Sequence, residues 1–95
     1  MQWRYGLLEY RWKGEVDVYE PIEIYFDLEG EELGARMWGA AGALGDTPTN
    51  LLEVLDRIKN DIALSSNNKP DVIRDGDYWW WADDPDNKHL YEGGE

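Results

Sequence analysis

The segment from Glu15 to Glu32, EVDVYEPIEIYFDLEGEE, constrains the fold of this chain more than any other. It carries eight acidic residues and no lysine or arginine. Within it, Ile22, Ile24, Phe26 and Leu28 alternate with polar residues. This period of two predicts a strand with one buried and one exposed face. We therefore expect a line of acidic and tyrosine side chains in water, forming the functional surface.

The chain has 95 residues, which predicts one domain near the lower size limit for a self-sufficient core. Six tryptophans and six tyrosines supply enough apolar surface for such a core without crosslinks. The absence of cysteine excludes disulfides and thiolate chemistry. No apolar run is long enough to span a membrane, and the N-terminus lacks a signal-peptide pattern. We expect a cytoplasmic protein that does not bind membranes.

The formal net charge of −12 comes from 21 acidic and 9 basic residues. Such a surface repels nucleic acid and anionic lipid, so direct binding to DNA or RNA is disfavoured. Two interpretations of the charge remain. It either provides solubility alone or attracts a basic protein partner. The many tyrosines and tryptophans beside the acidic residues favour the partner, because interfaces are enriched in aromatic side chains.

Three strands are expected before the helix. Residues 3–12 are apolar on both faces, which suggests a central strand, and Gly14 marks the turn after it. Pro21 precedes a second strand, 22–28, since proline is tolerated at a strand start. A turn at 29–31 then leads to a third strand at 32–38. Together these segments predict an antiparallel meander.

A helix and a hairpin are expected after the meander. Asp46 or Thr47 followed by Pro48 is typical of a helix start. The helix should run to about residue 64, with one apolar stripe packed across the sheet: Leu51, Val54, Leu55, Ile58 and Ile62. Asp75-Gly76 then predicts a hairpin with arms 72–74 and 78–81. In this arrangement Trp79 and Trp81 share one face, while Tyr78 and Trp80 share the other.

These segments predict an α+β fold with the order β-β-β-α-β-β. The sheet should be antiparallel, with about four to five strands and one amphipathic helix on one face. Residues 1–82 are expected to form this single domain, and residues 83–95 an acidic, flexible C-terminal tail.

Catalytic and metal-binding patterns are weak. The only histidine, His89, falls in the expected tail, and Ser65 and Ser66 lack a nucleophile motif. Glu9 is more readily explained by pairing with Arg4 or Arg11 than by catalysis. A calcium-loop alignment starting at Asp84 places a lysine and a histidine at essential positions. We therefore expect no enzyme, no cofactor and no metal site.

The run WKGEVDVYEPIEIYFDLEGEELGARMW resembles small bacterial domains that carry an EPIEIY-type strand, an acidic turn and a second strand. In general character the chain is also similar to small acidic immunity proteins of bacterial toxin systems and to phage inhibitors of host defence. Such proteins are single compact domains without an active site. The resemblance implies a function in protein binding rather than catalysis.

The sequence thus predicts a stoichiometric inhibitor, of the toxin-immunity or phage anti-defence (anti-CRISPR) type. As a nucleic-acid mimic, it would block a basic partner such as a nuclease toxin or a defence effector, acting as a monomer or homodimer. The alternative is a structural or assembly module whose aromatic residues serve self-association. The expected partner-binding residues are Glu20, Glu23, Tyr25, Asp27, Glu29, Glu31, Glu32, Asp75, Asp77, Trp80, Asp83 and Asp84.

Overall fold

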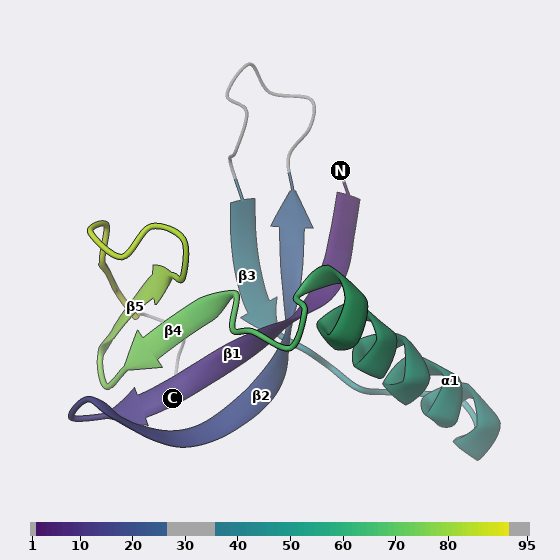
Figure 1. The fold of residues 1–95 in the computed structure, drawn as a ribbon. Helices are drawn as coiled ribbons and strands as arrows, with labels where there is room; N and C mark the ends of the chain where they lie inside the picture. The colour runs from purple at the N-terminus through teal and green to yellow at the C-terminus, as the bar shows by residue number, and fades with distance from the viewer. Residues whose placement is uncertain (1, 27–35, 92–95) are drawn as a thin grey trace.

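The computed structural model describes residues 2–26 and 36–91, and within them the chain forms one helix and a curled, six-stranded sheet (Figure 1). The strand order in the sheet is β3-β2-β1-β4-β5-β6. The predicted α+β class is confirmed. The elements are β1 (Gln2–Trp12), β2 (Glu15–Phe26), β3 (Arg36–Ala40), α1 (Pro48–Asn60), a π-helical continuation η1 (Asp61–Ser65), β4 (Val72–Asp75), β5 (Tyr78–Trp81) and β6 (His89–Leu90).

The sheet differs from the predicted antiparallel one in two ways. It is mixed, because β4 runs parallel to β1 in the register Leu8↔Val72 to Arg11↔Asp75. The connection through the helix is long enough to return the chain beside β1 in the same direction, which a hairpin cannot do. A sixth strand, β6, pairs with β5 and has only two residues, too few for a pattern in the sequence.

Strand β1 is central, as predicted, and the meander β1-β2-β3 is antiparallel. Lys13 and Gly14 both have positive φ, 53° and 85°, which suits a two-residue hairpin turn. Strand β2 starts at Glu15, well before the predicted start, and runs through Pro21. Proline fits inside this strand because β3 pairs with β2 only from Ile22 onward.

The core lies on one face of the sheet. Leu8, Ile22, Ile24 and Val72 are at most 2% exposed, and Trp81 completes their cluster. Burying each aliphatic side chain contributes about 2 kcal/mol. The alternation predicted for residues 22–26 is thus confirmed on its buried side.

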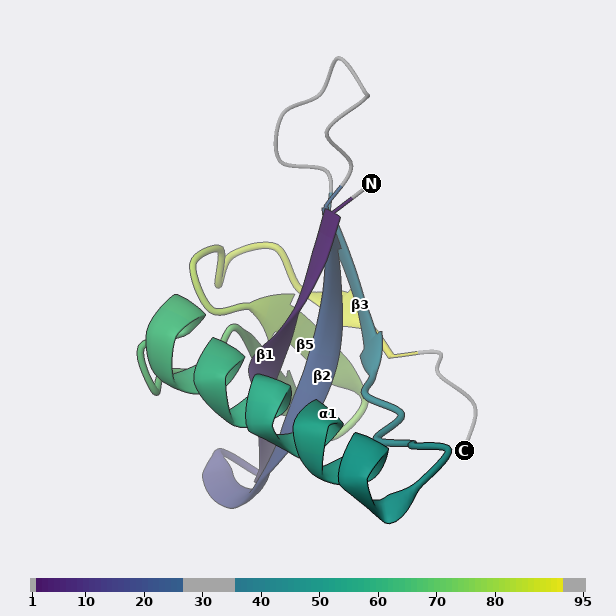
Figure 2. The same cartoon turned by 90° about the vertical axis from the view of Figure 1, so that its right-hand side faces the viewer.

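The curl of the sheet is visible in its aromatic contacts. Trp38 on β3 meets Trp79 on β5 edge to face, with ring centroids 5.5 Å apart, and stacks on Tyr91 at 6.0 Å. These residues belong to opposite ends of the strand order, so the two ends of the sheet approach each other over the core face (Figure 2).

Helix α1 begins as predicted but packs differently. The Thr47 hydroxyl accepts a hydrogen bond from the Asn50 N–H at 3.0 Å, and Pro48 occupies the first turn. However, Ile58 is the only residue of α1 that is buried, and Leu55 is 44% exposed. The predicted packing of the whole stripe across the sheet is wrong. The C-terminal end of the helix lies against β1, whereas its N-terminal end projects away (Figure 1).

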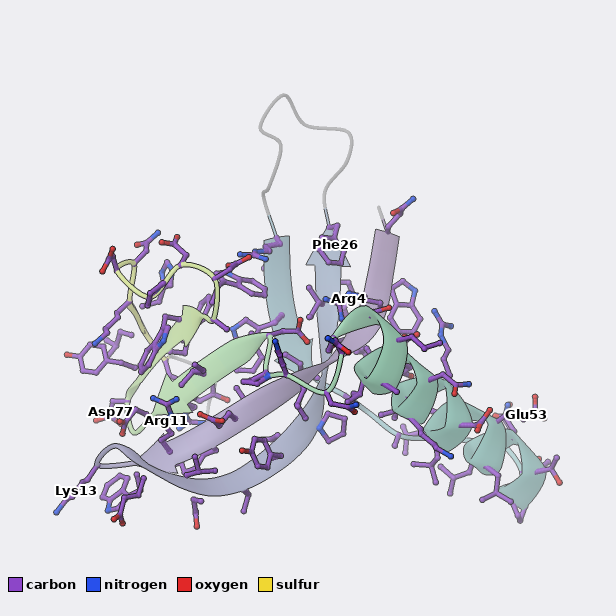
Figure 3. The ribbon with its side chains drawn as sticks, in the orientation of Figure 1. Arg4, Arg11, Lys13, Phe26, Glu53 and Asp77 are labelled. Carbon is purple, nitrogen blue, oxygen red and sulfur yellow. The ribbon has the colours of Figure 1, made fainter. Side chains whose placement is uncertain are left out.

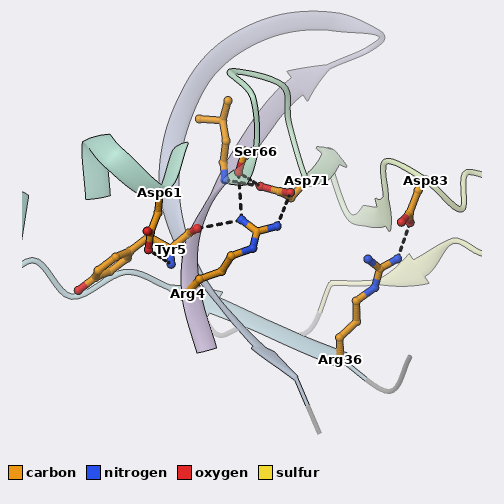
Figure 4. Close-up of polar contacts among 8 residues, drawn as sticks. Arg4, Tyr5, Arg36, Asp61, Ser66, Asp71 and Asp83 are labelled. Atoms are coloured by element: carbon orange, nitrogen blue, oxygen red, sulfur yellow. Dashed lines mark hydrogen bonds and ion pairs between the residues drawn. The ribbon is translucent and has the colours of Figure 1, made fainter. Parts of the chain in front are cut away.

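A polar cluster holds this end of the helix to β1, and we call it the Asp71 cluster (Figure 4). Strand β4 pairs only with Leu8–Arg11, so the preceding N–H groups of β1 need other acceptors. The Leu7 N–H donates to Asp71 Oδ2 and the Tyr5 N–H to Asp61 Oδ2, each at 3.0 Å. Arg4 pairs with Asp71 Oδ1 at 3.0 Å, and Ser66 Oγ donates to Asp71 Oδ2 at 2.6 Å.

Replacing Asp71 tests the importance of this cluster. Asp71→Ala removes the acceptor of the Leu7 N–H and the ion-pair partner of Arg4, which keeps only the Tyr5 carbonyl and Ser66 Oγ, at a partly buried site. We expect the free energy of unfolding, measured by urea denaturation, to fall by about 2–3 kcal/mol. The matched control, Asp86→Ala, changes an exposed aspartate. A loss for Asp71→Ala no larger than the control's, within about 0.5 kcal/mol, would contradict this account.

Candidate functional site

The first half of β2 is exposed throughout: every side chain from Glu15 to Glu20 faces solvent, and we call this segment the hairpin edge. Strand β3 reaches only Ile22, so no described strand covers its outer side. Three of the six residues are acidic: Glu15, Asp17 and Glu20. The other three expose about half of their surface: Val16 49%, Val18 50% and Tyr19 57%.

The backbone of the hairpin edge is open for hydrogen bonding. Tyr5 and Leu7 donate their N–H groups away from β2, toward Asp61 and Asp71. In an antiparallel ladder, two residues that lie opposite each other both direct their backbone N–H and C=O groups either toward or away from the neighbouring strand. The direction alternates along the strand, so every second residue has the same one. Tyr19, opposite Glu9, therefore directs its N–H and C=O toward the open side.

The hairpin edge also carries features that limit unspecific strand pairing. Pro21 follows it directly and offers no N–H. The register shifts between Tyr10 and Arg11, which leaves Asp17 without a partner on β1, and such a bulge bends the strand. Proline, bulges and charges are the usual protections of an exposed edge. Any strand added to this edge would therefore have to match its negative charge.

Tyr19 is held to the sheet by a buried carboxylate. Its hydroxyl donates to Glu9 Oε1 at 3.2 Å, and Glu9, which is 7% exposed, also accepts from Arg11 Nε at 2.6 Å. Glu9 thus pairs with Arg11, one of its two predicted partners. Loss of hydration and the hydrogen bond to Glu9 raise the pKa of Tyr19 above its ordinary value. The ring is therefore oriented although it is exposed.

The predicted residues of the acidic strand separate into three groups. Glu20 is exposed on the hairpin edge. Glu23 and Tyr25 lie on the face of β2 opposite to Ile22 and Ile24. They are half-buried rather than fully in water, contrary to expectation. There the Tyr25 hydroxyl donates to the Glu23 carboxylate, which raises the pKa of Tyr25. Asp27, Glu29, Glu31 and Glu32 lie outside the described residues.

The second predicted group is divided between the two ends of β5. The predicted Asp75-Gly76 hairpin is confirmed. Asp75 accepts from the Gly14 N–H at 3.0 Å, which brings the β4–β5 turn and the exposed Asp77 to the tip of the β1–β2 hairpin (Figure 3). Asp83 and Asp84 are exposed beyond the other end of β5, where Asp83 pairs with Arg36.

Trp80 is not the exposed anchor that its position suggested. It is 9% exposed, and the Lys88 ammonium lies 4.8 Å from its ring centroid. Trp79 and Trp81 share the core face, as predicted, and Trp80 lies on the opposite face, which residues after β5 help to cover. Lys88 and β6 both belong to residues 83–91, the first part of the segment that the sequence predicted to be a tail.

A second feature, which the sequence did not indicate, is a pocket of about 500 Å³ between β3 and the strands β5 and β6. Its ring-bearing lining consists of Trp38, Trp79, Trp81, His89 and Tyr91, and we call it the aromatic pocket. His89, expected to be exposed in a tail, stacks on Trp79 with centroids 4.4 Å apart. The period of two predicts that Trp79 and Trp81 share a face, but it cannot place Trp38 opposite them.

Comparisons with known proteins add no relative: no protein-family model, curated protein or solved structure matches the chain. Among residues 2–26 and 36–91, no helix has the length and apolar character needed to cross a membrane. In the same residues, no group of three or more histidine or acidic side chains is placed to hold a metal ion.

The raised pKa values of Tyr19 and Tyr25 predict a loss of stability in alkali. Each hydroxyl loses its proton in the unfolded chain at a lower pH than in the folded protein. Their contribution to stability is therefore complete below the unfolded pKa and lost as pH rises through the folded pKa. We expect the free energy of unfolding of Tyr19→Phe/Tyr25→Phe to decline less steeply than that of the wild type between about pH 10 and pH 12. The free energy of unfolding is measured by urea denaturation at each pH, and an equal decline with pH in the variant and the wild type would contradict this prediction.

Proposed function

We propose that the protein is a non-enzymatic, stoichiometric inhibitor, of the toxin-immunity or phage anti-defence type, that blocks a basic, nucleic-acid-handling protein through its hairpin edge. One observation carries the proposal: an open strand edge combines three exposed carboxylates with exposed Val16, Val18 and Tyr19. The carboxylates attract a basic surface electrostatically, and the apolar side chains provide surface area that becomes buried in a complex.

Charge accounts for the encounter. A net charge of −12 attracts a basic partner over long range and speeds association at low salt. Glu15, Asp17 and Glu20 then meet the lysines or arginines that otherwise hold phosphates. Occupation of those groups excludes the nucleic acid, so inhibition needs no chemical step.

The backbone and Tyr19 account for the lifetime of the complex. The outward N–H and C=O of Tyr19 can pair with an added strand of the partner, a recurring mode of recognition. The Tyr19 ring is already oriented by Glu9, so little side-chain freedom remains to be lost on binding. Such anchors chiefly slow dissociation.

A second function, the assembly module, is favoured by the helix side of the molecule. Leu44, Leu52 and Leu64 are 81%, 65% and 81% exposed. Exposed leucines of this kind support self-association rather than binding of a charged partner. The two functions differ in the surface they use, so variants of the hairpin edge distinguish them.

The test compares two triple charge reversals. Glu15→Lys/Asp17→Lys/Glu20→Lys changes the hairpin edge, and Glu53→Lys/Asp56→Lys/Asp86→Lys changes exposed residues elsewhere, with Glu53 far along the helix (Figure 3). Both alter the net charge equally. The readouts are capture of a basic protein from host lysate at low and high salt, and one-to-one inhibition of its nucleic-acid activity.

We expect the hairpin-edge variant to lose at least roughly tenfold in affinity, about 1.4 kcal/mol, while the control changes much less. Wild-type binding should weaken with salt. An equal loss in both variants would show that only net charge matters. Recovery of the protein alone, as an oligomer that tolerates the hairpin-edge reversal, would instead support the assembly module.

A further inference from the structure

The aromatic pocket is a separate candidate binding site that shares no residue with the hairpin edge. Its volume of about 500 Å³ lies within the range of small-molecule sites. It lies where the two ends of the curled sheet meet: Trp38 comes from β3, Trp79 and Trp81 from β5, and Tyr91 follows β6. Ligand sites are common at the mouths of β-barrels, and this hollow lies where an open but curled sheet brings its two ends together.

The rings of this pocket stand in two nearly perpendicular orientations. Trp79 is inclined by 81° to Trp38 and by 83° to Trp81, with centroids 5.5 and 5.8 Å apart. Tyr91 is inclined by only 22° to Trp38 and stacks on it, so it supports that wall from one side. Each ring carries negative electrostatic potential on its faces. All four rings line the same pocket, with Trp79 at right angles to both Trp38 and Trp81.

The protein's own cations already use these faces. The Arg36 guanidinium lies 4.1 Å from the centroid of Trp81, and the Arg74 guanidinium lies 3.6 Å from that of Tyr91. Arg36 is also paired with Asp83, which offsets its charge at the pocket. The rings can therefore act as cation platforms, and two of them already carry a guanidinium of the chain, Arg36 on Trp81 and Arg74 on Tyr91.

The other ligand classes fit less well. The net charge of −12 repels an anion such as a nucleotide. A sugar needs several hydrogen-bonding side chains beside its stacking platform. Among the lining residues, apart from the indole N–H groups, only Arg36, His89 and Tyr91 have polar side chains, and Arg36 is already paired. A compact organic cation needs little beyond the ring faces.

We propose that the aromatic pocket binds a methylated ammonium group, with Trp38, Trp79 and Trp81 as its walls and with Arg36 as an internal competitor. The proposal goes beyond the inhibitor function and does not depend on it. A ligand of this class carries its charge on a compact, weakly hydrated centre, which suits a pocket of aromatic faces.

The experiment titrates the protein with choline and, separately, with its neutral isostere 3,3-dimethyl-1-butanol, in 150 mM NaCl. Binding is followed by the indole N–H signals in NMR spectra and by tryptophan fluorescence. We expect saturable binding of choline with shifts at the pocket tryptophans, and at least roughly tenfold weaker binding of the neutral isostere. Equal affinity for the two compounds, or no saturable choline binding, would overturn the proposal.

Two variants act in opposite directions. Trp38→Leu removes one wall and should weaken choline binding at least roughly tenfold. Arg36→Gln removes the competing guanidinium from the face of Trp81 and should strengthen binding several-fold, which loss of folding cannot produce. The hairpin-edge triple reversal is the matched control and should change choline affinity less than twofold. Weaker binding in Arg36→Gln, or a large loss in the control, would contradict the proposed site.

Discussion

The Asp71 carboxylate is the contact on which the arrangement of this sheet depends. It accepts the Leu7 N–H and pairs with Arg4, and the Asp71 N–H in turn donates to the Leu7 C=O at 2.8 Å. Asp71 directly precedes β4, so these bonds set the place where β4 joins β1. The neighbouring Asp61 fixes the end of the helix on Tyr5 in the same way. Two acidic residues thus connect the helix and the last three strands to the central strand.

This mode of attachment explains why the molecule exposes so much apolar surface. The helix is held at its C-terminal end, so its N-terminal half does not cover the sheet, and Leu52 stays 65% exposed. Before the segment of β1 that pairs with β4, the N–H groups of Tyr5 and Leu7 donate to the Asp61 and Asp71 side chains, whereas the outer side of the hairpin edge has no described partner. The same sheet therefore presents an acidic strand edge on β2 and, where its ends converge, the aromatic pocket.

Much of the local structure was predictable because local rules determine it. The alternation of Ile22 and Ile24, the Thr47 cap before Pro48 and the Asp75-Gly76 turn each depend on neighbours in sequence. The long-range pairings were not predictable. A period of two assigns a residue to one face of a strand, but it does not determine which strand pairs with it. Hence the parallel β1–β4 pair, the two-residue β6 and the contact of Trp38 with Trp79 required the structure.

The candidate surface was predictable in part. The sequence marked residues 15–32 as acidic and half apolar, but it could not show that Glu20 and Glu23 lie on opposite faces of a strand that continues through Pro21. Nor could it show that Trp80 is covered. The exposed part of the candidate surface is instead residues 15–20, before Pro21, which the sequence did not predict to be a strand.

Amide hydrogen exchange, compared between the free protein and its complex with the captured basic protein, shows directly whether the hairpin edge is the binding surface. We expect slowed exchange at residues 15–20, with the amide of Tyr19 strongly affected because it points to the open side, and little change along α1. Protection confined to α1, with the hairpin edge exchanging as fast as in the free protein, would contradict the account.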